Sequence, residues 1–309
     1  MDQRDTQPVR PPDRGGLLTE QRNAASMALD TLSIEQCVAL INDADATVAG
    51  AVRTASDSIT SFVERVERGM RAGGRLVYLG AGTSGRLGVL DASECPPTFR
   101  VDPGLVVGII AGGDGALRKS SEGMEDDPLG ATEALDELGV GERDSVLGIA
   151  AGGTTPYVLG ALRESKLRGA TTGLLVCTPI EKPAEVDDLI VVETGPEVLT
   201  GSTRMKAGTA TKLVLNTIST TLMVRTGKVH ENLMVDLRAT NAKLRDRAAR
   251  IIGELTGLER NDAFSLLDRA DGVVKTAVVM HARGVERADA EQLLAESGGV
   301  LRGALDVLK

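Results

Sequence analysis

The sequence predicts an α/β protein: a doubly wound, five-stranded parallel sheet flanked by helices, with a small helical appendage at the C-terminus. Two observations support this fold class. Five short apolar runs recur between residues 76 and 192, and helical segments separate most of them. Glycines also follow the first three runs. Strands that alternate with helices are typical of parallel sheets, and glycine turns fit the loops at their ends.

The N-terminal half gives the elements in order. Residues 1–16 are polar and contain prolines and arginines, so we expect a flexible leader there. From Ser33 to about Ala72 apolar residues repeat near the helical period, and Gly73-Gly74 is typical of a C-terminal cap. The expected strands are Leu76–Leu79, Leu105–Ile110, Val146–Ala150, Leu174–Cys177 and Leu189–Val192.

The C-terminal half is predicted to be mainly helical. A hydroxyl-rich stretch leads into a long helix through Met223, and a further helix is expected from His230 to Glu254. From Asn261 onwards three short helical patterns follow, interrupted by glycines. We therefore divide the chain into a leader (1–16), a main domain (17–256) and a helical subdomain (257–309). The alternative is that these last helices complete the main core.

Composition excludes several classes of protein. The 309 residues are 42% hydrophobic and carry a formal net charge of −9, which disfavours binding to nucleic acid or an anionic membrane. The odd number of well-separated cysteines (Cys37, Cys95 and Cys177) indicates a reducing compartment without a disulfide framework. No apolar run approaches the ~20 residues that span a bilayer. We expect a cytoplasmic protein.

The most informative motif is the glycine-rich turn after the first strand, Gly80-Ala-Gly-Thr-Ser-Gly85. A strand, a glycine turn and a helix N-terminus together present backbone N–H groups to an anion, which favours phosphate. The motif also matches G-x-G-x-x-G, so a dinucleotide site is an alternative. However, Cys95-Pro96-Pro97 interrupts the segment, and the next good strand begins after Asp102, so we favour a sugar phosphate. A turn without a ligand remains the third reading.

Two later stretches are predicted to join this turn. One follows the third strand and ends at Pro156, and the other precedes the long helix; both are rich in glycine and hydroxyl groups. Ligands of open α/β sheets bind beyond the carboxyl ends of the strands, so the three stretches indicate one crevice. The candidate phosphate-binding residues are Gly82, Thr83, Ser84, Gly153, Thr154, Thr155, Ser202, Thr203 and Lys206.

Two acidic clusters are candidates for proton transfer. One is Asp91-Ala-Ser-Glu94, after which Pro96 and Pro97 are expected to halt a helix, and the other is Glu122–Asp127. Paired carboxylates in one crevice can divide the roles of general acid and base, although acids near helix ends are more often solvated. His230 and His281 are far apart and no Cys/His cluster is present, so we predict no metal site.

Two long motifs carry a resemblance to a known family. The segment Gly80–Phe99 resembles the first signature of the N-acetylmuramic acid 6-phosphate etherases, and Gly195–Asn216 resembles the second, which glucokinase regulatory proteins share. The segments 19–23, 122–126 and 232–241 also fit. The resemblance covers essentially residues 17–309, and the leader before Gly16 is a departure from the family pattern.

The resemblance implies a sugar isomerase (SIS) fold, a homodimer, and no metal or nucleotide cofactor. It also implies a phosphosugar substrate whose D-lactyl ether at C3 is cleaved to give N-acetylglucosamine 6-phosphate and D-lactate. An ether lacks an electrophilic carbonyl, so elimination from the open-chain aldehyde followed by addition of water is the easier route. By motif position Glu94 is expected to protonate the departing lactate, and Glu125 to be the second acid/base. Burial beside Cys95-Pro96-Pro97 would raise the pKa of Glu94 and so help to keep its carboxyl group protonated.

Three functions remain open at this point. They are the etherase, a sugar-phosphate isomerase on the same fold, and a protein that senses a sugar phosphate and regulates a partner. Glu94 and Glu125 both match positions of the family's acid/base residues. This favours the etherase, because a sensor needs no acid/base pair. Glu122, Asp126 and His230 are alternatives to Glu125 as the base at C2. Release of lactate from the muramyl substrate would distinguish the three.

Overall fold

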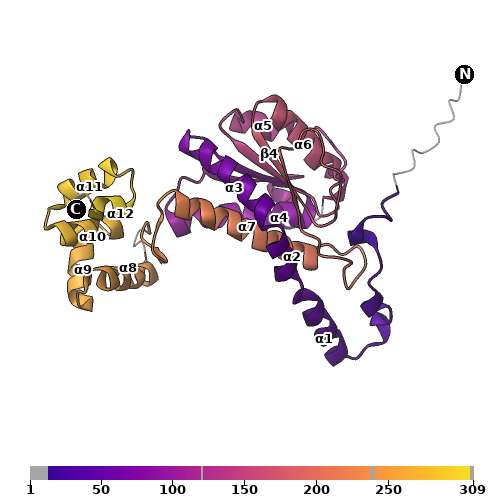
Figure 1. Cartoon of the computed structure of the whole chain (residues 1–309), viewed down its shortest axis with the longest axis horizontal. Coiled ribbons are helices and arrows are strands. Elements are labelled where there is room, and N and C mark those ends of the chain that lie inside the picture. Colours follow the sequence, from indigo (N-terminus) through magenta and orange to yellow (C-terminus); the bar gives the residue numbers. More distant parts are fainter. Residues whose placement is uncertain (1–12, 120, 238–240, 307–309) are drawn as a thin grey trace, which may run out of the picture.

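A computed structural model describes residues 13–119, 121–237 and 241–306, so most of the leader predicted over residues 1–16 lies outside the described residues. The chain forms a five-stranded sheet with strand order β2-β1-β3-β4-β5, and every neighbouring pair is parallel. Helices flank it (Figure 1). The predicted fold class is therefore confirmed. The strands are β1 (Leu76–Gly80), β2 (Val106–Ile110), β3 (Ser145–Ile149), β4 (Thr171–Val176) and β5 (Asp188–Val191).

Helices cover both faces of the sheet because alternate strand residues point to opposite sides. Tyr78 and Leu147 belong to the apolar cluster with α3, α4 and α7, whereas Val77 and Val146 belong to the cluster with α5 and α6. These helices are α3 (Ser56–Arg71), α4 (Gly82–Phe99), α5 (Thr132–Leu138), α6 (Pro156–Leu167) and α7 (Lys206–Arg225).

The N-terminal helices extend away from this core. The helical region expected from Ser33 to Ala72 consists of α1 (Ile34–Asp45), α2 (Val48–Thr54) and α3. Ser33 begins α1 with a capping box to Gln36. Figure 1 shows α1 projecting from the body of the protein. Short 3₁₀ helices are η1 (Leu18–Glu20), η2 (Ala24–Ser26), η3 (Leu29–Thr31), η4 (Asp114–Leu117) and η5 (Glu122–Met124).

The prolines of α4 do not halt the helix where the sequence suggested. Pro96 and Pro97 lie inside α4, which continues to Phe99 and ends at Arg100 in the left-handed conformation. Proline lacks a backbone N–H and its ring crowds the carbonyl four residues earlier, which is costly in a helix interior, and α4 ends two residues after Pro97. The expectation of an earlier end was therefore wrong by about one turn.

The chain after α7 also differs from the prediction. The first part of the helix expected from His230 to Glu254 is instead a small antiparallel pair, β6 (Val229–His230) and β7 (Leu233–Met234). Glu231, in the turn between them, has a φ of 52°, which a helix does not allow. Four helices, rather than three, follow α8 (Ala242–Thr256): α9 (Arg260–Arg269), α10 (Val274–Arg283), α11 (Arg287–Glu296) and α12 (Leu301–Asp306).

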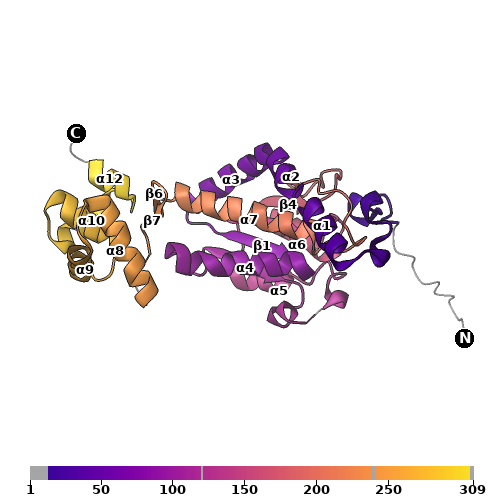
Figure 2. The ribbon, with the colours of Figure 1, turned by 90° about the horizontal axis from the view of Figure 1, so that it is seen from below.

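The last five helices share one apolar cluster. Buried residues of α8, such as Ile252, belong to the same cluster as Leu267 of α9 and Val278 of α10. Figure 2 shows α8–α12 as a group beside the body, joined to it through β6 and β7. The boundary predicted between residues 256 and 257 remains a prediction; Val235 and Leu237, well before it, already belong to the apolar cluster of the last helices.

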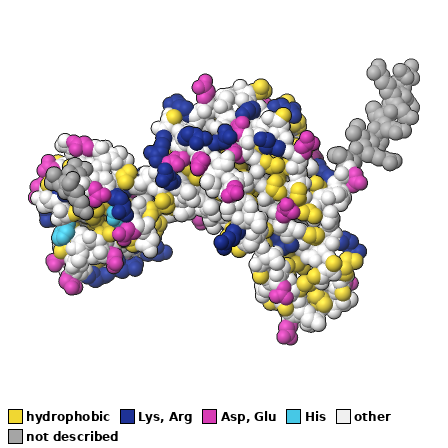
Figure 3. Space-filling view, in the orientation of Figure 1, with side chains coloured by type: hydrophobic (Ala, Val, Ile, Leu, Met, Phe, Trp, Pro, Cys, Tyr) yellow, Lys and Arg dark blue, Asp and Glu magenta, His cyan; other side chains and the backbone are white. Residues whose placement is uncertain are grey.

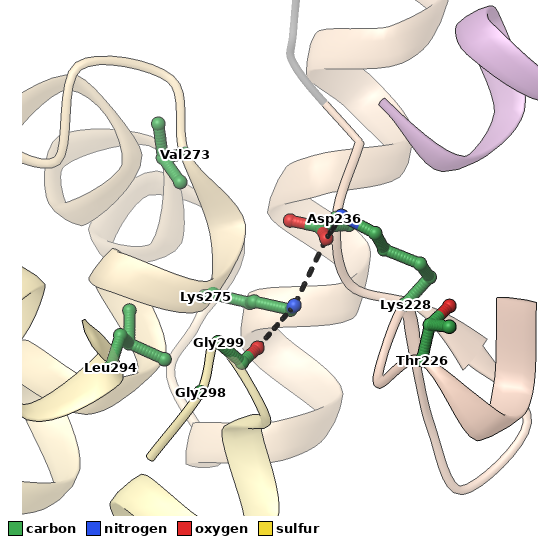
Figure 4. A pocket seen from close by; sticks show the side chains of 8 residues that line it. All are labelled: Thr226, Lys228, Asp236, Val273, Lys275, Leu294, Gly298 and Gly299. Carbon is green, nitrogen blue, oxygen red and sulfur yellow. Dashed lines mark hydrogen bonds and ion pairs between the residues drawn. The ribbon is translucent and has the colours of Figure 1, made fainter. Parts of the chain in front are cut away.

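A buried lysine links this unit to the body. Lys275 of α10 donates hydrogen bonds to Gly227 O (2.9 Å), Gly299 O (2.6 Å) and Asp236 Oδ2 (3.0 Å). Figure 4 shows its amine pointing between Asp236 and Gly299, in a cavity of about 260 Å³. Burial lowers the pKa of Lys275, and Asp236 opposes that shift. Gly227 follows α7 of the body, whereas Gly299 lies between α11 and α12 of the C-terminal unit, so Lys275 joins the two parts of the chain.

Gly160 of α6 provides a test of how this helix packs against the loop at Pro128. A Cβ atom at Gly160 would lie 1.8 Å from the carbonyl oxygen of Pro128, in the loop that follows Glu125. Gly160→Ala should therefore reduce the free energy of unfolding by about 1–3 kcal/mol, measured by urea denaturation. The control is Gly50→Ala in α2, where nothing lies within 4 Å and alanine should stabilise the helix. Equal effects of the two substitutions would contradict this packing.

Candidate active site

A cavity of about 240 Å³ lies beyond the carboxyl ends of β1 and β3. It brings together two of the three stretches that the sequence predicted to meet, and one residue of the third. Six of the candidate phosphate-binding residues line it, together with Glu125. The six are Gly82, Thr83, Ser84, Thr154, Thr155 and Thr203.

Two helix N-termini meet at this cavity. Helix α4 begins at Gly82 after Ala81, and α6 begins at Pro156 after Thr155; at neither N-terminus does a side chain cap the backbone N–H groups. The first N–H groups of a helix have no partner within the helix, and the helix dipole is positive there. The cavity can therefore hold an anion such as phosphate, with hydroxyl groups as further donors.

Gly82 allows a carboxylate to approach this turn. Its φ is 51°, and a Cβ atom at this position would lie 3.2 Å from Glu125 Oε1. The loop that carries Glu125 is held to α6 by the Tyr157 N–H, which donates to the Glu125 carbonyl oxygen (3.1 Å). The structure thus places the carboxyl group of Glu125 beside the predicted phosphate site.

The alternatives to Glu125 as the base are less well placed. Asp126 is exposed and does not line the cavity. His230 follows the C-terminal end of α7, whereas Thr203 precedes its N-terminal end. The 20 residues of α7 span about 30 Å, so His230 is far from this cavity in its own chain. The side chain of Glu122, the remaining alternative, lies outside the part of the chain that the structure describes.

Glu94 lies outside the cavity that Glu125 lines. Its side chain is 62% exposed, and its Oε2 atom is 3.8 Å from the Nζ atom of Lys212. The expected burial of Glu94 near Cys95 is therefore wrong within this chain: Cys95 faces the core, while Glu94 faces outward. Burial raises the pKa of the Cys95 thiol to about 12, so this thiol is protonated at neutral pH.

Three other predicted ligands, Lys206, Ser202 and Gly153, do not line the cavity. Lys206 is buried, and its Nζ atom donates to Thr194 O (2.5 Å). Its backbone N–H donates to Glu197 Oε2 (3.0 Å), and Glu197 Oε1 also accepts from the Ala207 N–H (2.9 Å). Lys206 and Glu197 thus hold the start of α7 in place, a role that the sequence reasoning missed.

The N-terminal segment also contributes to the cavity, which the sequence did not predict. Arg14, Leu17 and Glu20 line the cavity. The Leu18 N–H donates to Thr178 Oγ1 (3.1 Å), which ties this segment to the chain just after β4. The available signal was the segment 19–23, which fits the family pattern and contains Glu20.

Neither a cluster of metal-ligating side chains nor a membrane-spanning helix occurs in residues 13–119, 121–237 and 241–306. No group of three or more His, Cys, Asp or Glu side chains is gathered there as metal ligands would be. None of the helices in these ranges is both long and apolar enough to cross a membrane.

The parallel five-stranded sheet and a match to a family model place the protein in the SIS class of α/β proteins. The family model for the glucokinase regulatory protein N-terminal SIS domain matches residues 56–166. The chain is 54% identical over 270 residues to an N-acetylmuramic acid 6-phosphate etherase from Crocosphaera subtropica, covering 87% of this chain and 88% of the relative. It is 52% identical over 271 residues to the etherase of Mycolicibacterium smegmatis, covering 87% and 91% of the two chains. This chain belongs to the N-acetylmuramic acid 6-phosphate etherase family.

Proposed function

We propose that this chain cleaves the D-lactyl ether of N-acetylmuramic acid 6-phosphate by elimination and addition of water. The products are N-acetylglucosamine 6-phosphate and D-lactate. The observation that best supports this is a single cavity where two uncapped helix N-termini, hydroxyl groups and the Glu125 carboxylate meet. Release of D-lactate by the wild-type chain tests the activity, and a chain that binds the phosphosugar without releasing lactate would contradict it.

The 6-phosphate lies at the N-termini of α4 and α6, where backbone N–H groups and the helix dipoles stabilise negative charge. With the phosphate held there, the sugar opens to its aldehyde, which acidifies the proton at C2. Glu125 is the base that removes this proton, and Glu94 is the acid that protonates the departing lactate oxygen. Water then adds at C3 of the resulting enal, which restores a hydroxyl group there.

Ser84 and Thr154 provide a test of the phosphate position. A hydrogen bond to a charged group contributes about 1.5–3 kcal/mol, so Ser84→Ala and Thr154→Ala should each weaken substrate binding roughly tenfold to a hundredfold. Calorimetric titration with N-acetylglucosamine 6-phosphate measures this without turnover. Ser202→Ala is the matched control, because Ser202 does not line the cavity. Unchanged affinity in both test variants would move the phosphate elsewhere.

We also propose a homodimer, as the family resemblance implies, and its interface is not expected on α7. The apolar side chains of α7, such as Leu215 and Ile218, are buried within the subunit. Exposed apolar side chains lie instead on the projecting α1, where Ile34 is 86% exposed and Val38 is 53% exposed. Figure 3 shows hydrophobic side chains gathered in this region, at the lower right. A second copy of the chain would cover this surface.

Substitutions that introduce charge on α1 test whether this helix forms the dimer interface. The wild-type chain should sediment as a dimer at micromolar concentration, whereas Ile34→Glu combined with Val38→Glu should give monomers. Leu167→Glu is the control, because Leu167 is 82% exposed but lies at the end of α6. A wild-type chain that sediments only as a monomer would contradict the dimer, and a double variant that remains dimeric would place the interface elsewhere.

The cellular role follows from the substrate. Muramic acid carries the lactyl ether that distinguishes it from glucosamine, and it is a sugar of the bacterial cell wall. We therefore place this etherase in the recycling of peptidoglycan and the catabolism of amino sugars, in the cytoplasm.

A further inference from the structure

A second cavity, of about 400 Å³, lies beside the first, between α4 and α7. Thr83 lines both cavities, so the groove starts at the predicted phosphate site. Residues of α4 form one wall, and the start of α7 with the residues just before it forms the other. The lining residues are Thr83, Leu87, Arg204, Gly208, Thr209, Lys212 and Leu213.

The two cavities differ in charge. The charged residues that line the first are Arg14, Glu20 and Glu125, which give it a net negative charge apart from its backbone donors. Those that line the second are both basic, Arg204 and Lys212. A carboxylate enclosed in a protein needs a cation or several donors as partners. The second cavity meets this requirement with Arg204 and Lys212, whereas the donors of the first are the helix N-termini and hydroxyl groups already assigned to the phosphate.

Lys212 is held in place by a buried network. Its Nζ atom donates to Asp91 Oδ1 (2.9 Å), and the Tyr78 hydroxyl donates to Asp91 Oδ2 (3.1 Å). The Asp91 side chain is 4% exposed, whereas that of Lys212 is 26% exposed. The buried partner thus fixes the lysine while leaving part of it open to the groove. The Oε2 atom of Glu94, one turn further along α4, is 3.8 Å from the same amine.

The substrate of the proposed function carries two anionic groups, the 6-phosphate and the lactyl carboxylate. We propose that the groove between α4 and α7 is the subsite for the lactyl group. Arg204 and Lys212 bind its carboxylate, and Leu87 contacts its methyl group. The inference rests on the proposed etherase function. This placement also explains how the departing lactate comes close to Glu94. The carboxyl group of Glu94 lies beside the Lys212 amine, and that amine binds the lactyl carboxylate.

The test compares ligands that differ only in the lactyl group. They are the substrate, its analogue with the lactyl carboxylate converted to an amide, and N-acetylglucosamine 6-phosphate, which lacks the lactyl group. In the wild-type chain the amide should have a kcat/KM roughly tenfold to a hundredfold below that of the substrate, as expected for the loss of a charge-assisted hydrogen bond.

Arg204→Met is the decisive variant because Arg204 is exposed and its loss should leave the fold intact. It should lower kcat/KM for the substrate by a similar factor and leave kcat/KM for the amide analogue nearly unchanged. The inhibition constant of N-acetylglucosamine 6-phosphate should also stay unchanged. Lys212→Met should behave alike, provided that circular dichroism shows it folded, because it also removes the partner of Asp91. Arg302→Met, on α12, is the control.

Equal losses of kcat/KM for the substrate and for its amide analogue in Arg204→Met would overturn the subsite. A parallel loss of affinity for N-acetylglucosamine 6-phosphate would also overturn it. A wild-type chain that releases no lactate would instead overturn the proposed function. In that case calorimetric Kd values of the acid and the amide still test the subsite. A preference for the acid that disappears in Arg204→Met would support it, and the absence of any preference would refute it.

Discussion

Glu94→Gln should stop the release of lactate while the proton at C2 continues to exchange with solvent deuterium. The two proton transfers use different groups, so removal of the acid blocks departure of lactate without blocking the deprotonation that precedes it. General acid catalysis contributes roughly 10²–10⁴-fold, and the rate of lactate release should fall by that factor. Proton NMR in D₂O measures exchange and elimination in one sample.

The position of Glu94 makes this a demanding test. Its side chain is 62% exposed in the single chain, so water must be excluded by the bound substrate or by a second subunit. Glu64→Gln, an exposed glutamate of α3, is the control and should leave both rates unchanged. Full lactate release by Glu94→Gln would refute its role as the acid. Loss of exchange together with elimination would show that the two roles are not separate.

Glu125→Gln should abolish exchange at C2 and lactate release together, because elimination cannot start before the C2 proton is removed. The expected loss is again roughly 10²–10⁴-fold for each rate. The structure supports this choice of base: Glu125 lines the cavity beside Gly82, and Gly82 leaves room for its carboxyl group.

Asp126→Asn is the matched control, because Asp126 is the next residue along the chain, is exposed and does not line the cavity. It should retain both rates. An Asp126→Asn variant that loses exchange, while Glu125→Gln retains it, would transfer the role of base to Asp126. Retention of exchange in both variants would exclude Glu125 and Asp126 as the base at C2.

The sheet could be predicted because its strands are short apolar runs with clear boundaries. Leu76–Leu79 is fully buried, and the glycines that follow it have few alternatives to a turn. The phosphate site followed from the same pattern, since turns at the carboxyl ends of adjacent strands must lie close together. Thr83 and Thr154 meet at one cavity because β1 and β3 are neighbours in the sheet.

The remaining features depend on contacts that a linear sequence does not specify. Lys206 was expected to bind phosphate, but its partners Thr194 and Glu197 precede it in a loop whose path cannot be read from composition. Glu94 and Cys95 are adjacent, yet the rotation of α4 buries one and exposes the other. The turn at Glu231 interrupts a pattern that is otherwise compatible with a helix.

The most direct test of the elimination and addition mechanism is the fate of solvent atoms during turnover by the wild-type chain. The reaction is run with N-acetylmuramic acid 6-phosphate in deuterated water enriched in ¹⁸O, and both products are analysed by NMR and mass spectrometry. Elimination and addition predict deuterium at C2 and ¹⁸O at C3 of the N-acetylglucosamine 6-phosphate, with no ¹⁸O from the cleavage step in the lactate. Lactate that gains ¹⁸O at its C2 hydroxyl, with a sugar that has no deuterium at C2, would contradict it.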